Sequence, residues 1–222
     1  MIKKVDAFIF DLDGVITDTA EFHYLAWKEL AKSLGISIDR EFNETLKGVS
    51  RMDSLERILE LGNKQNDYIM EEKEKLSIHK NDAYVKLIQN ISPTDLLPNV
   101  ENFLRSLKEA NIKIAMASAS KNAMMVSKLL KVERYFDHIV DASTVALSKP
   151  NPEVFLKAAK AIEVNPENCI GVEDAAAGVV AIKSANMYAV AIGDASVLAD
   201  ADLILESTKE LNLKNILDKY NS

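Results

Sequence analysis

The sequence is poor in cysteine and has no long apolar run. Its one cysteine, Cys169, lies in the apolar segment Cys169-Ile170-Gly171-Val172. A disulfide bond within the chain is therefore impossible, and the thiol is expected to be an inert part of the core. No apolar segment approaches the roughly 20 residues needed to cross a bilayer. Lys3-Lys4 lead directly into a short apolar run without the pattern of a secretory leader. We therefore expect a cytoplasmic protein with no membrane partner.

The sequence also lacks an excess of basic residues. It has 27 Lys and Arg against 34 Asp and Glu, which gives a net charge of −7. This balance disfavours nucleic acid or an anionic membrane as the main partner. A bound phosphate group would have to be held by a few local cations rather than by a basic field. At 222 residues, the chain can form one large domain or a domain with an insertion.

Short apolar runs indicate the strands of an α/β fold. The runs lie at 5–10, 112–117, 138–141, 169–172 and 188–192, with a weaker one at 203–205. Helical patterns separate them at 99–110, 121–131, 152–163, 174–186 and 208–220, the last opening with the capping-box pattern of Ser207 and Glu210. Strands that alternate with helices predict a doubly wound parallel sheet with helices on both faces.

Residues 16–95 interrupt this alternation with helical patterns alone, at 19–34, 40–47, 52–62 and 66–90. We interpret 16–92 as an inserted all-helical cap domain on a core domain formed by 1–15 and 93–222. The alternative is a single helical layer over the sheet. The cap is favoured because the insertion begins directly after two carboxylates, where a lid would be useful.

Those two carboxylates, Asp11 and Asp13, end the first apolar run. Residues i and i+2 of an extended chain point to the same side, so the two side chains are expected to converge. Close carboxylates repel each other unless a cation or a proton lies between them. The pair suits a divalent cation and a phosphate, with one Asp as nucleophile and the other as acid/base. A calcium loop would need an acidic residue where Val15 stands, and a solvated turn is the ordinary alternative.

Polar groups also follow three later strands, and in a doubly wound sheet ligands bind beyond the carboxyl ends of the strands. They are Ser118-Ala119-Ser120-Lys121-Asn122, Ser148-Lys149-Pro150 and Glu173-Asp174. Each has an ordinary alternative: a serine N-cap, a solvated lysine, or acids favoured by a helix dipole. Together with the first pair they would gather carboxylates, hydroxyl and N–H donors and a lysine at one edge. That combination suits Mg²⁺-assisted phosphoryl transfer.

The ordered set of motifs resembles the haloacid dehalogenase superfamily. The motifs stand here as DLDGV at 11–15, Ser118 after an apolar strand, Lys149, and Glu173-Asp174 within GVEDA. The resemblance implies that Asp11 is a nucleophile that forms an aspartyl-phosphate and that Asp13 is the general acid/base. Ser118 and Lys149 would bind the transferring phosphoryl group.

The same resemblance implies a magnesium site. Mg²⁺ would be held by Asp11, the carbonyl oxygen of Asp13 and Asp174, with Glu173 assisting. The substrate would be a small phosphorylated molecule, and the superfamily includes both capped phosphatases and mutases.

A combination of segments in and outside the cap resembles the sugar-phosphate mutases of the superfamily, which interconvert β-glucose 1-phosphate and glucose 6-phosphate. The resemblance is carried by Asp18 to His23, by Leu46 to Arg51 and by ASASKN at 117–122. It implies a catalytic or coupling role for Thr19, His23 and Lys47. It also implies a substrate site that includes Trp27, Lys47, Gly48, Val49, Ser50, Arg51, Lys80, Ala119, Ser120, Lys121 and Asn122. Arg51 would hold the non-transferring phosphate with Ser120, Lys121 and Asn122, and Trp27, Gly48, Val49 and Lys80 would line the sugar site.

Local alternatives remain for the cap residues. Arg51 can be a surface charge at the start of a helix, and His23 and Trp27 can be packing residues.

Two functions compete with that of a mutase: a capped phosphatase, and a non-enzymatic phospho-acceptor of the kind found in signalling receiver domains. Receiver domains, however, have no cap insertion. A lid with its own phosphate-binding arginine favours a mutase, because it excludes water until a substrate with a second phosphate closes it. Such an enzyme works as a monomer.

Overall fold

The computed structural model describes residues 4–222. Its internal contacts divide the chain into two compact units, one that ends at Asp18 and resumes from Ile91 to Ser222, and one formed by Thr19–Asn90. The domain boundaries expected from the sequence, after residues 15 and 92, stay a prediction. Each unit is described here by itself.

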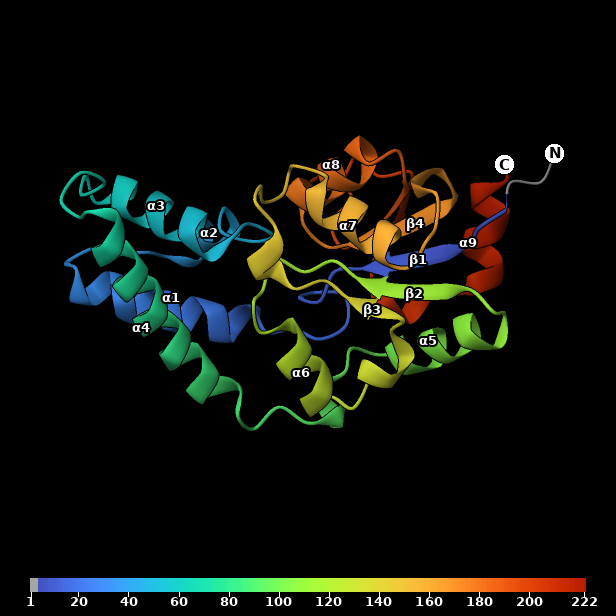
Figure 1. Ribbon diagram of the computed structural model, residues 1–222, viewed down its shortest axis with the longest axis horizontal. Helices are drawn as coiled ribbons and strands as arrows, with labels where there is room; N and C mark the ends of the chain where they lie inside the picture. Colours follow the sequence, from blue (N-terminus) through green and yellow to red (C-terminus); the bar gives the residue numbers. More distant parts are fainter. Residues whose placement is uncertain (1–3) are drawn as a thin grey trace. The chain divides into compact units, whose positions relative to one another are not determined.

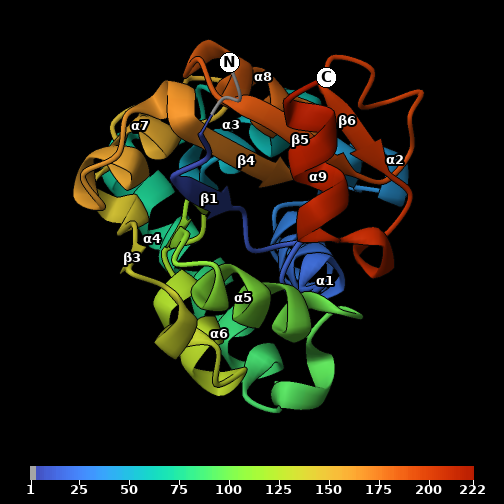
Figure 2. The same cartoon turned by 90° about the vertical axis from the view of Figure 1, so that its right-hand side faces the viewer.

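The larger unit contains a six-stranded sheet whose neighbouring strands are all parallel, in the order β3-β2-β1-β4-β5-β6. The strands are β1 Ala7–Phe10, β2 Lys113–Met116, β3 His138–Ile139, β4 Cys169–Glu173, β5 Tyr188–Ile192 and β6 Leu203–Leu205. Figures 1 and 2 show helices on both sides of this sheet. The predicted α/β class with a doubly wound parallel sheet is confirmed.

Strand β1 is buried on both faces, which is why its sequence is almost continuously apolar. Ala7 and Ile9 belong to a core cluster with residues of the helices that follow β3 and β4. The alternate residues Phe8 and Phe10 contact the ring of Phe103, at centroid distances of 5.5 and 6.1 Å. The helices of this unit are α5 Val100–Glu109, α6 Ala123–Leu129, α7 Glu153–Ala161, α8 Ala176–Ser184 and α9 Leu213–Tyr220.

The helix expected over 208–220 is shorter than the sequence pattern indicated. Ser207 precedes a 3₁₀ turn, Thr208–Glu210, which ends at Glu210, and the α-helix begins only at Leu213. Leu211 leaves the helical conformation and is buried, and the side chain of Asn212 then caps the helix by accepting from the backbone N–H of Asn215. The capping-box pattern, which predicts the start of an α-helix, here precedes only a single 3₁₀ turn.

The smaller unit consists, within the residues described, of helices and their connections: α1 Ala20–Ser33, α2 Arg40–Glu44, α3 Arg51–Leu61 and α4 Met70–Ile88. Its core forms where α1 meets α3, with Trp27, Leu30, Leu55 and Ile58 buried in one cluster. Gly35 has a positive φ of 73° just after α1 ends, a conformation that side chains other than glycine disfavour.

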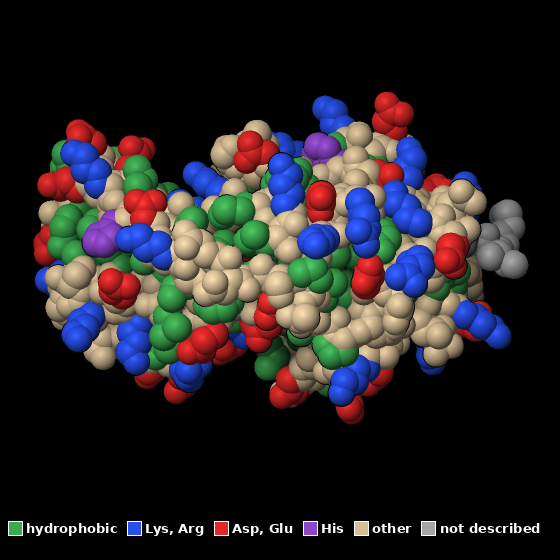
Figure 3. All heavy atoms as spheres, turned by 90° about the horizontal axis from the view of Figure 1, so that it is seen from below, with side chains coloured by type: hydrophobic (Ala, Val, Ile, Leu, Met, Phe, Trp, Pro, Cys, Tyr) green, Lys and Arg blue, Asp and Glu red, His purple; other side chains and the backbone are tan. Residues whose placement is uncertain are grey.

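Acidic and basic side chains are interspersed over the face of the molecule drawn in Figure 3. This agrees with the near balance of the two signs in the composition. Among the described residues, the helices are all too short or too polar to serve as a membrane span.

Candidate active site

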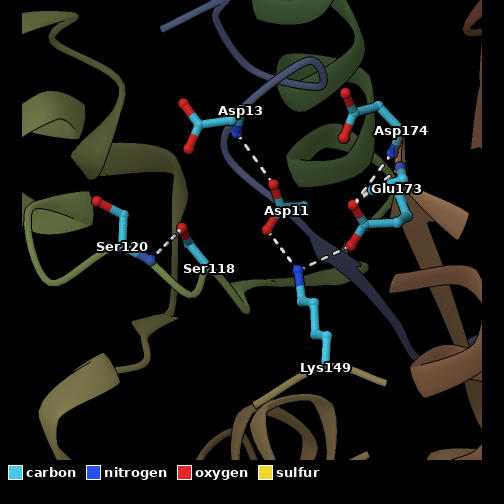
Figure 4. Close-up of polar contacts among 8 residues, drawn as sticks. Asp11, Asp13, Ser118, Ser120, Lys149, Glu173 and Asp174 are labelled. Carbon is cyan, nitrogen blue, oxygen red and sulfur yellow. Dashed lines mark hydrogen bonds and ion pairs between the residues drawn. The ribbon is translucent and has the colours of Figure 1, made fainter. Parts of the chain in front are cut away.

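The carboxyl ends of β1, β2 and β4 meet at one edge of the sheet. Phe10 is in register with Met116 on one side and with Val172 on the other. The residues that follow, Asp11 and Ser118, are therefore brought to the same edge as Glu173, the last residue of β4. All three are buried, with Asp11 only 5% exposed. Figure 4 shows the carboxylates of Asp11 and Glu173 directed toward the ammonium of Lys149, and the hydroxyl of Ser118 directed toward Ser120.

Lys149 connects two of these side chains. Its ammonium lies 2.6 Å from Oδ1 of Asp11 and 2.8 Å from Oε2 of Glu173, and the residue is 1% exposed. Burial by itself would lower the pKa of Lys149, but the charges of the two carboxylates outweigh it and raise that pKa. The ring of Phe155 lies beneath the ammonium, 5.1 Å away. Lys149 is thus a charged, buried residue of the site and not a solvated surface lysine.

Glu173 is held from several sides. Its Oε1 accepts from the backbone N–H groups of Asp174 and Ala175, at 3.2 and 3.3 Å. Burial raises the pKa of Glu173, Asp11 adds to that effect, and Lys149 partly opposes it. Helix α8 approaches so closely that a Cβ atom on Gly178 would lie 2.0 Å from the carboxyl group. Glycine at 178 is therefore a condition for this placement of Glu173.

A cluster of three carboxylates fits a hard divalent cation. One oxygen each of Asp11, Glu173 and Asp174 lies within 4.8 Å of the others. Lys149 supplies one positive charge against these three negative ones, so the cluster keeps a negative excess when all are ionised. Oxygen ligands of this kind are those that Mg²⁺ and Ca²⁺ take. These three acids are among the four residues that the family resemblance implied for a metal, the fourth being Asp13 through its carbonyl oxygen.

Asp13 lies beside this cluster in a way that the sequence did not predict. Its backbone N–H donates to Oδ2 of Asp11 at 3.0 Å, while its side chain extends away from Asp11 in Figure 4. The chain bends at Leu12 and turns at Gly14, where φ is 71°. The expected convergence of the two carboxylates assumed an extended chain through residue 13, and it stays a prediction.

The segment after β2 winds into helix α6 through two side-chain turns. Ser118 Oγ accepts from the N–H of Ser120 at 3.1 Å, and Ser120 Oγ accepts from the N–H of Asn122 at 3.2 Å. Asn122, rather than a serine, occupies the N-cap position of α6. Ala119 and Lys121 lie within the same turn, with Lys121 exposed. A helix N-terminus with polar residues around it is a suitable place for an anion.

In the smaller unit, Lys80 is a buried cation among aromatic rings. It is 2% exposed, and its Nζ lies 4.6 Å from the ring centroid of Trp27 and 5.0 Å from that of Tyr84. The ammonium also lies 2.8 Å from Nδ1 of His23. Since an ammonium can only donate, Nδ1 accepts and the proton of a neutral imidazole lies on Nε2. The hydroxyl of Tyr84 donates to Oγ1 of Thr19 at 3.3 Å.

Burial lowers the pKa of His23 well below its usual value, and the charges of Lys80 and Arg51 add to that shift. Arg51 is the first residue of α3 and is half-buried. Its Nη2 donates to Oδ1 of Asn81 at 2.7 Å, and burial lowers the pKa of Arg51. Arg51 is therefore more than a freely solvated charge at a helix start.

The segment before α3 has ordinary structural partners of its own. Ser50 is the N-cap of α3 and accepts from the N–H of Asp53 at 3.2 Å. Lys47 pairs with Glu44 at 2.8 Å, Gly48 has a φ of 72°, and Val49 is buried.

Comparison with known proteins agrees with this geometry. The sequence pattern of haloacid dehalogenase-like hydrolases matches residues 5–186. The chain belongs to that family. The matched segment includes all the residues of the site described above: Asp11, Ser118, Lys149, Glu173 and Asp174.

Within the haloacid dehalogenase-like family, the chain is 46% identical over 214 residues to the β-phosphoglucomutase of Bacillus subtilis (strain 168), covering 96% of this chain and 95% of that one. The crystal structure of β-phosphoglucomutase from Clostridium difficile matches with a TM-score of 0.97 at 52% identity, over 98% of this chain and 97% of the other. A phosphorylated carbohydrates phosphatase of Thermotoga maritima is 28% identical over 91% of both chains.

Sequence reasoning missed two residues that contact the expected cap residues. Asn81 accepts from Arg51, and Tyr84 contacts both His23 and Lys80. For Tyr84, the available signal was its spacing from Lys80 on the same helix. Tyr84, four residues further on, shares its face, whereas Asn81 is an adjacent residue with no sequence cue.

Proposed function

We propose that the protein is a β-phosphoglucomutase that interconverts β-D-glucose 1-phosphate and D-glucose 6-phosphate. The reaction would proceed through an aspartyl-phosphate on Asp11 and a β-glucose 1,6-bisphosphate intermediate, with Mg²⁺ as cofactor. The observation that carries the proposal is the buried Asp11 carboxylate, held by the ammonium of Lys149 at 2.6 Å beside the acidic cluster. The full-length similarity to β-phosphoglucomutases supports the choice of substrate.

Asp11 is suited to nucleophilic attack on phosphorus. Its Oδ1 accepts a hydrogen bond from the ammonium of Lys149, and its Oδ2 accepts one from the backbone N–H of Asp13. These two bonds fix the orientation of the carboxylate. Lys149 and Ser118 would bind oxygens of the transferring phosphoryl group, where the ammonium offsets part of the negative charge.

Mg²⁺ would be held by Asp11, the carbonyl oxygen of Asp13 and Asp174, with Glu173 assisting. When bound, it would neutralise charge on the phosphoryl oxygens. Gly14 and Gly178 leave the space in which Asp174 and Glu173 reach the cluster.

The proposed cycle is symmetric. The 6-hydroxyl of β-glucose 1-phosphate attacks the phosphorus on Asp11; the new O–P bond forms as the bond to Asp11 breaks, and Asp13 takes the hydroxyl proton. The bisphosphate then reorients. Asp11 attacks the phosphorus at position 1, the bond from that phosphorus to the sugar oxygen breaks, and Asp13 returns the proton to this oxygen.

Residues of the cap and of the segment after β2 would bind the rest of the substrate. Arg51, Ser120, Lys121 and Asn122 would hold the phosphate that is not being transferred, and Trp27, Gly48, Val49 and Lys80 would line the sugar site. His23 and Lys47 would couple closure of the cap to the placement of Asp13, and Thr19 would take part in catalysis. Ser50 and Ala119 would complete the binding segments. Closure would keep water from the aspartyl-phosphate until a sugar hydroxyl is in place.

A capped phosphatase is the second candidate, because a carbohydrate phosphatase also matches over most of the chain. One incubation separates the two. The protein is mixed with Mg²⁺, β-glucose 1-phosphate and a trace of glucose 1,6-bisphosphate, and the products are measured. Glucose 6-phosphate is the expected product. Free phosphate as the main product would replace the mutase with a phosphatase, and the absence of both would overturn phosphoryl transfer altogether.

A further inference from the structure

The loop between β3 and α7 carries Lys149, so the conformation of this loop decides where the ammonium lies. The segment before Lys149 is a surface segment, and Leu147 in it is 57% exposed. Val145 packs against the core cluster of the larger unit, but Ala146 and Leu147 are exposed. Burial of apolar side chains therefore contributes little at these two residues, and polar contacts hold them.

Those contacts come from the first turns of α7. Glu153 Oε1 accepts from the N–H of Ala146 at 3.0 Å, and Oε2 accepts from the N–H of Leu147 at 2.8 Å. Lys157, one helical turn later, pairs with Glu153 at 2.8 Å and donates to the carbonyl of Thr144. Two neighbouring side chains of one helix thus bind three backbone groups of the loop, at Thr144, Ala146 and Leu147.

The helix that holds the loop is itself fixed in the core. Val154, Phe155 and Ala158 are fully or almost fully buried against the sheet. Phe155 also lies beneath the ammonium of Lys149. Helix α7 therefore provides both a rigid support for the loop and the apolar surface next to the charged group that the loop delivers.

The carboxylate of Glu153 is stabilised in its charged form. Lys157 and the two N–H groups lower the pKa of Glu153 to about 2. It is consequently ionised at every pH at which the protein would work. Protonation of Glu153 therefore does not remove this contact in that pH range.

We propose that Glu153 is a positioning residue that fixes the loop at Ala146 and Leu147 and thereby holds the Lys149 ammonium between Asp11 and Glu173. Lysine has a long flexible stem, so a loosened loop would let the ammonium move away from the two carboxylates. The placement itself is a structural claim. Its effect on turnover rests on the proposed function.

The placement is tested by amine acetylation, which needs no enzymatic activity. Wild-type protein and Glu153→Ala are treated with acetic anhydride, and modification of each lysine is measured by peptide mass spectrometry. Lys149 should react about tenfold faster in the variant, because charge-assisted hydrogen bonds to the loop are lost. Lys80, which is buried in the other unit, is the internal control and should be unchanged. Equal increases at both lysines, or none at Lys149, would overturn the proposal.

Matched variants make the comparison specific. Glu153→Gln keeps an oxygen that can accept from the loop N–H groups and should preserve most of the protection. Glu71→Ala removes an exposed glutamate from the first turn of α4, where it pairs with Lys75 four residues later at 2.6 Å, and should have no effect on Lys149. If Glu153→Ala does not fold, Glu153→Asp keeps the charge but retracts the carboxylate from the loop, and is judged by the same outcomes.

Kinetics complete the test. Mutase turnover of Glu153→Ala should fall about 10- to 100-fold, because the Lys149 ammonium would no longer be held in place beside Asp11. KM should change little. Glu153→Gln should restore most of it. An inactive wild type would overturn the proposed function while the acetylation result still decides the placement. Full turnover in a variant whose Lys149 has become reactive would overturn the positioning role.

Discussion

Gly14 lies against Asp174 so closely that a Cβ atom built on it would be 2.1 Å from Oδ2 of that carboxylate. The turn after β1 thus needs a residue without a side chain in order to place Asp174 beside Asp11. Gly14→Ala should displace Asp174 and weaken divalent-cation binding about 10- to 100-fold, the cost typical of disturbing the groups that orient metal ligands. Titration calorimetry with Mg²⁺ measures this loss directly.

Gly35 provides the matched control. Its φ of 73° is almost that of Gly14 at 71°, but a Cβ atom on Gly35 would meet nothing within 4 Å. Gly35→Ala therefore introduces the same backbone strain without a clash, and Mg²⁺ affinity should stay at the wild-type value. Equal affinity in the two variants would show that the contact with Asp174 does not control the cation site.

Asp11→Asn should abolish the phosphoenzyme and all turnover while the protein remains folded. An amide cannot act as the attacking carboxylate, although it keeps the size of the side chain. The measurement is hydroxylamine-labile incorporation of phosphate, with circular dichroism to follow the fold. Asp13→Asn is the comparison: it keeps the nucleophile, so it should still form phosphoenzyme but transfer the group about 10²- to 10⁴-fold more slowly. Turnover that persists in Asp11→Asn would place the nucleophile elsewhere.

The strands and the edge of the sheet could be predicted because their signals are local. A parallel strand buried on both faces is a short apolar run, as in β1, and polar residues directly after such runs lie at one edge. This logic located Asp11, Ser118 and Glu173. The order of the strands did not follow from these signals, because it depends on contacts between segments far apart in the sequence.

The remaining features depend on the path of the chain. The sequence marked Lys149 as a placed cation, but nothing local indicates that its ammonium reaches two buried carboxylates. The bend at Leu12 was not indicated either, since periodicity says nothing of where an extended segment ends. From the sequence alone, Glu153 is an ordinary acidic residue at the start of a helix. Its loop partners become visible only in three dimensions.

The buried imidazole of His23 should make stability depend on pH. Burial and the charges of Lys80 and Arg51 lower its pKa in the folded state, whereas the unfolded chain takes up a proton near the ordinary value of about 6.5. Below that value the unfolded state binds more protons, so the free energy of unfolding decreases as the pH falls. For one proton the limit is about 1.4 kcal/mol per pH unit.

His23→Gln removes the titrating group and should flatten this dependence. Denaturant unfolding of both proteins at pH 8, 7, 6 and 5 measures it: the two curves of unfolding free energy against pH should run parallel above about pH 6.5 and diverge in slope below it. Identical slopes down to pH 5 would mean that His23 is able to take up a proton in the folded protein.

Arg51 offers the sharpest separation of mutase from phosphatase, because it lies in the smaller unit and its guanidinium is oriented by Asn81. If it binds the distal phosphate, its charge-assisted hydrogen bonds contribute about 1.5–3 kcal/mol. Arg51→Ala should then weaken substrate affinity about 10- to 100-fold. Turnover should also fall, since the same contact is proposed to drive closure.

Hydrolysis of acetyl phosphate, which has a single phosphate, needs no distal contact and should stay constant or rise in Arg51→Ala as water gains entry. Arg51→Lys should restore the mutase only in part, because an ammonium cannot bind phosphate through a planar fork. Arg57 lies on the same helix and donates to the carbonyl of Thr45, so Arg57→Ala is the control for losing a cation from α3 and should leave both activities near wild type. Equal losses of both activities in Arg51→Ala, or no loss of either, would remove Arg51 from the substrate site. The phosphatase would then be the better assignment, because the argument for excluding water depends on a cap that senses the second phosphate.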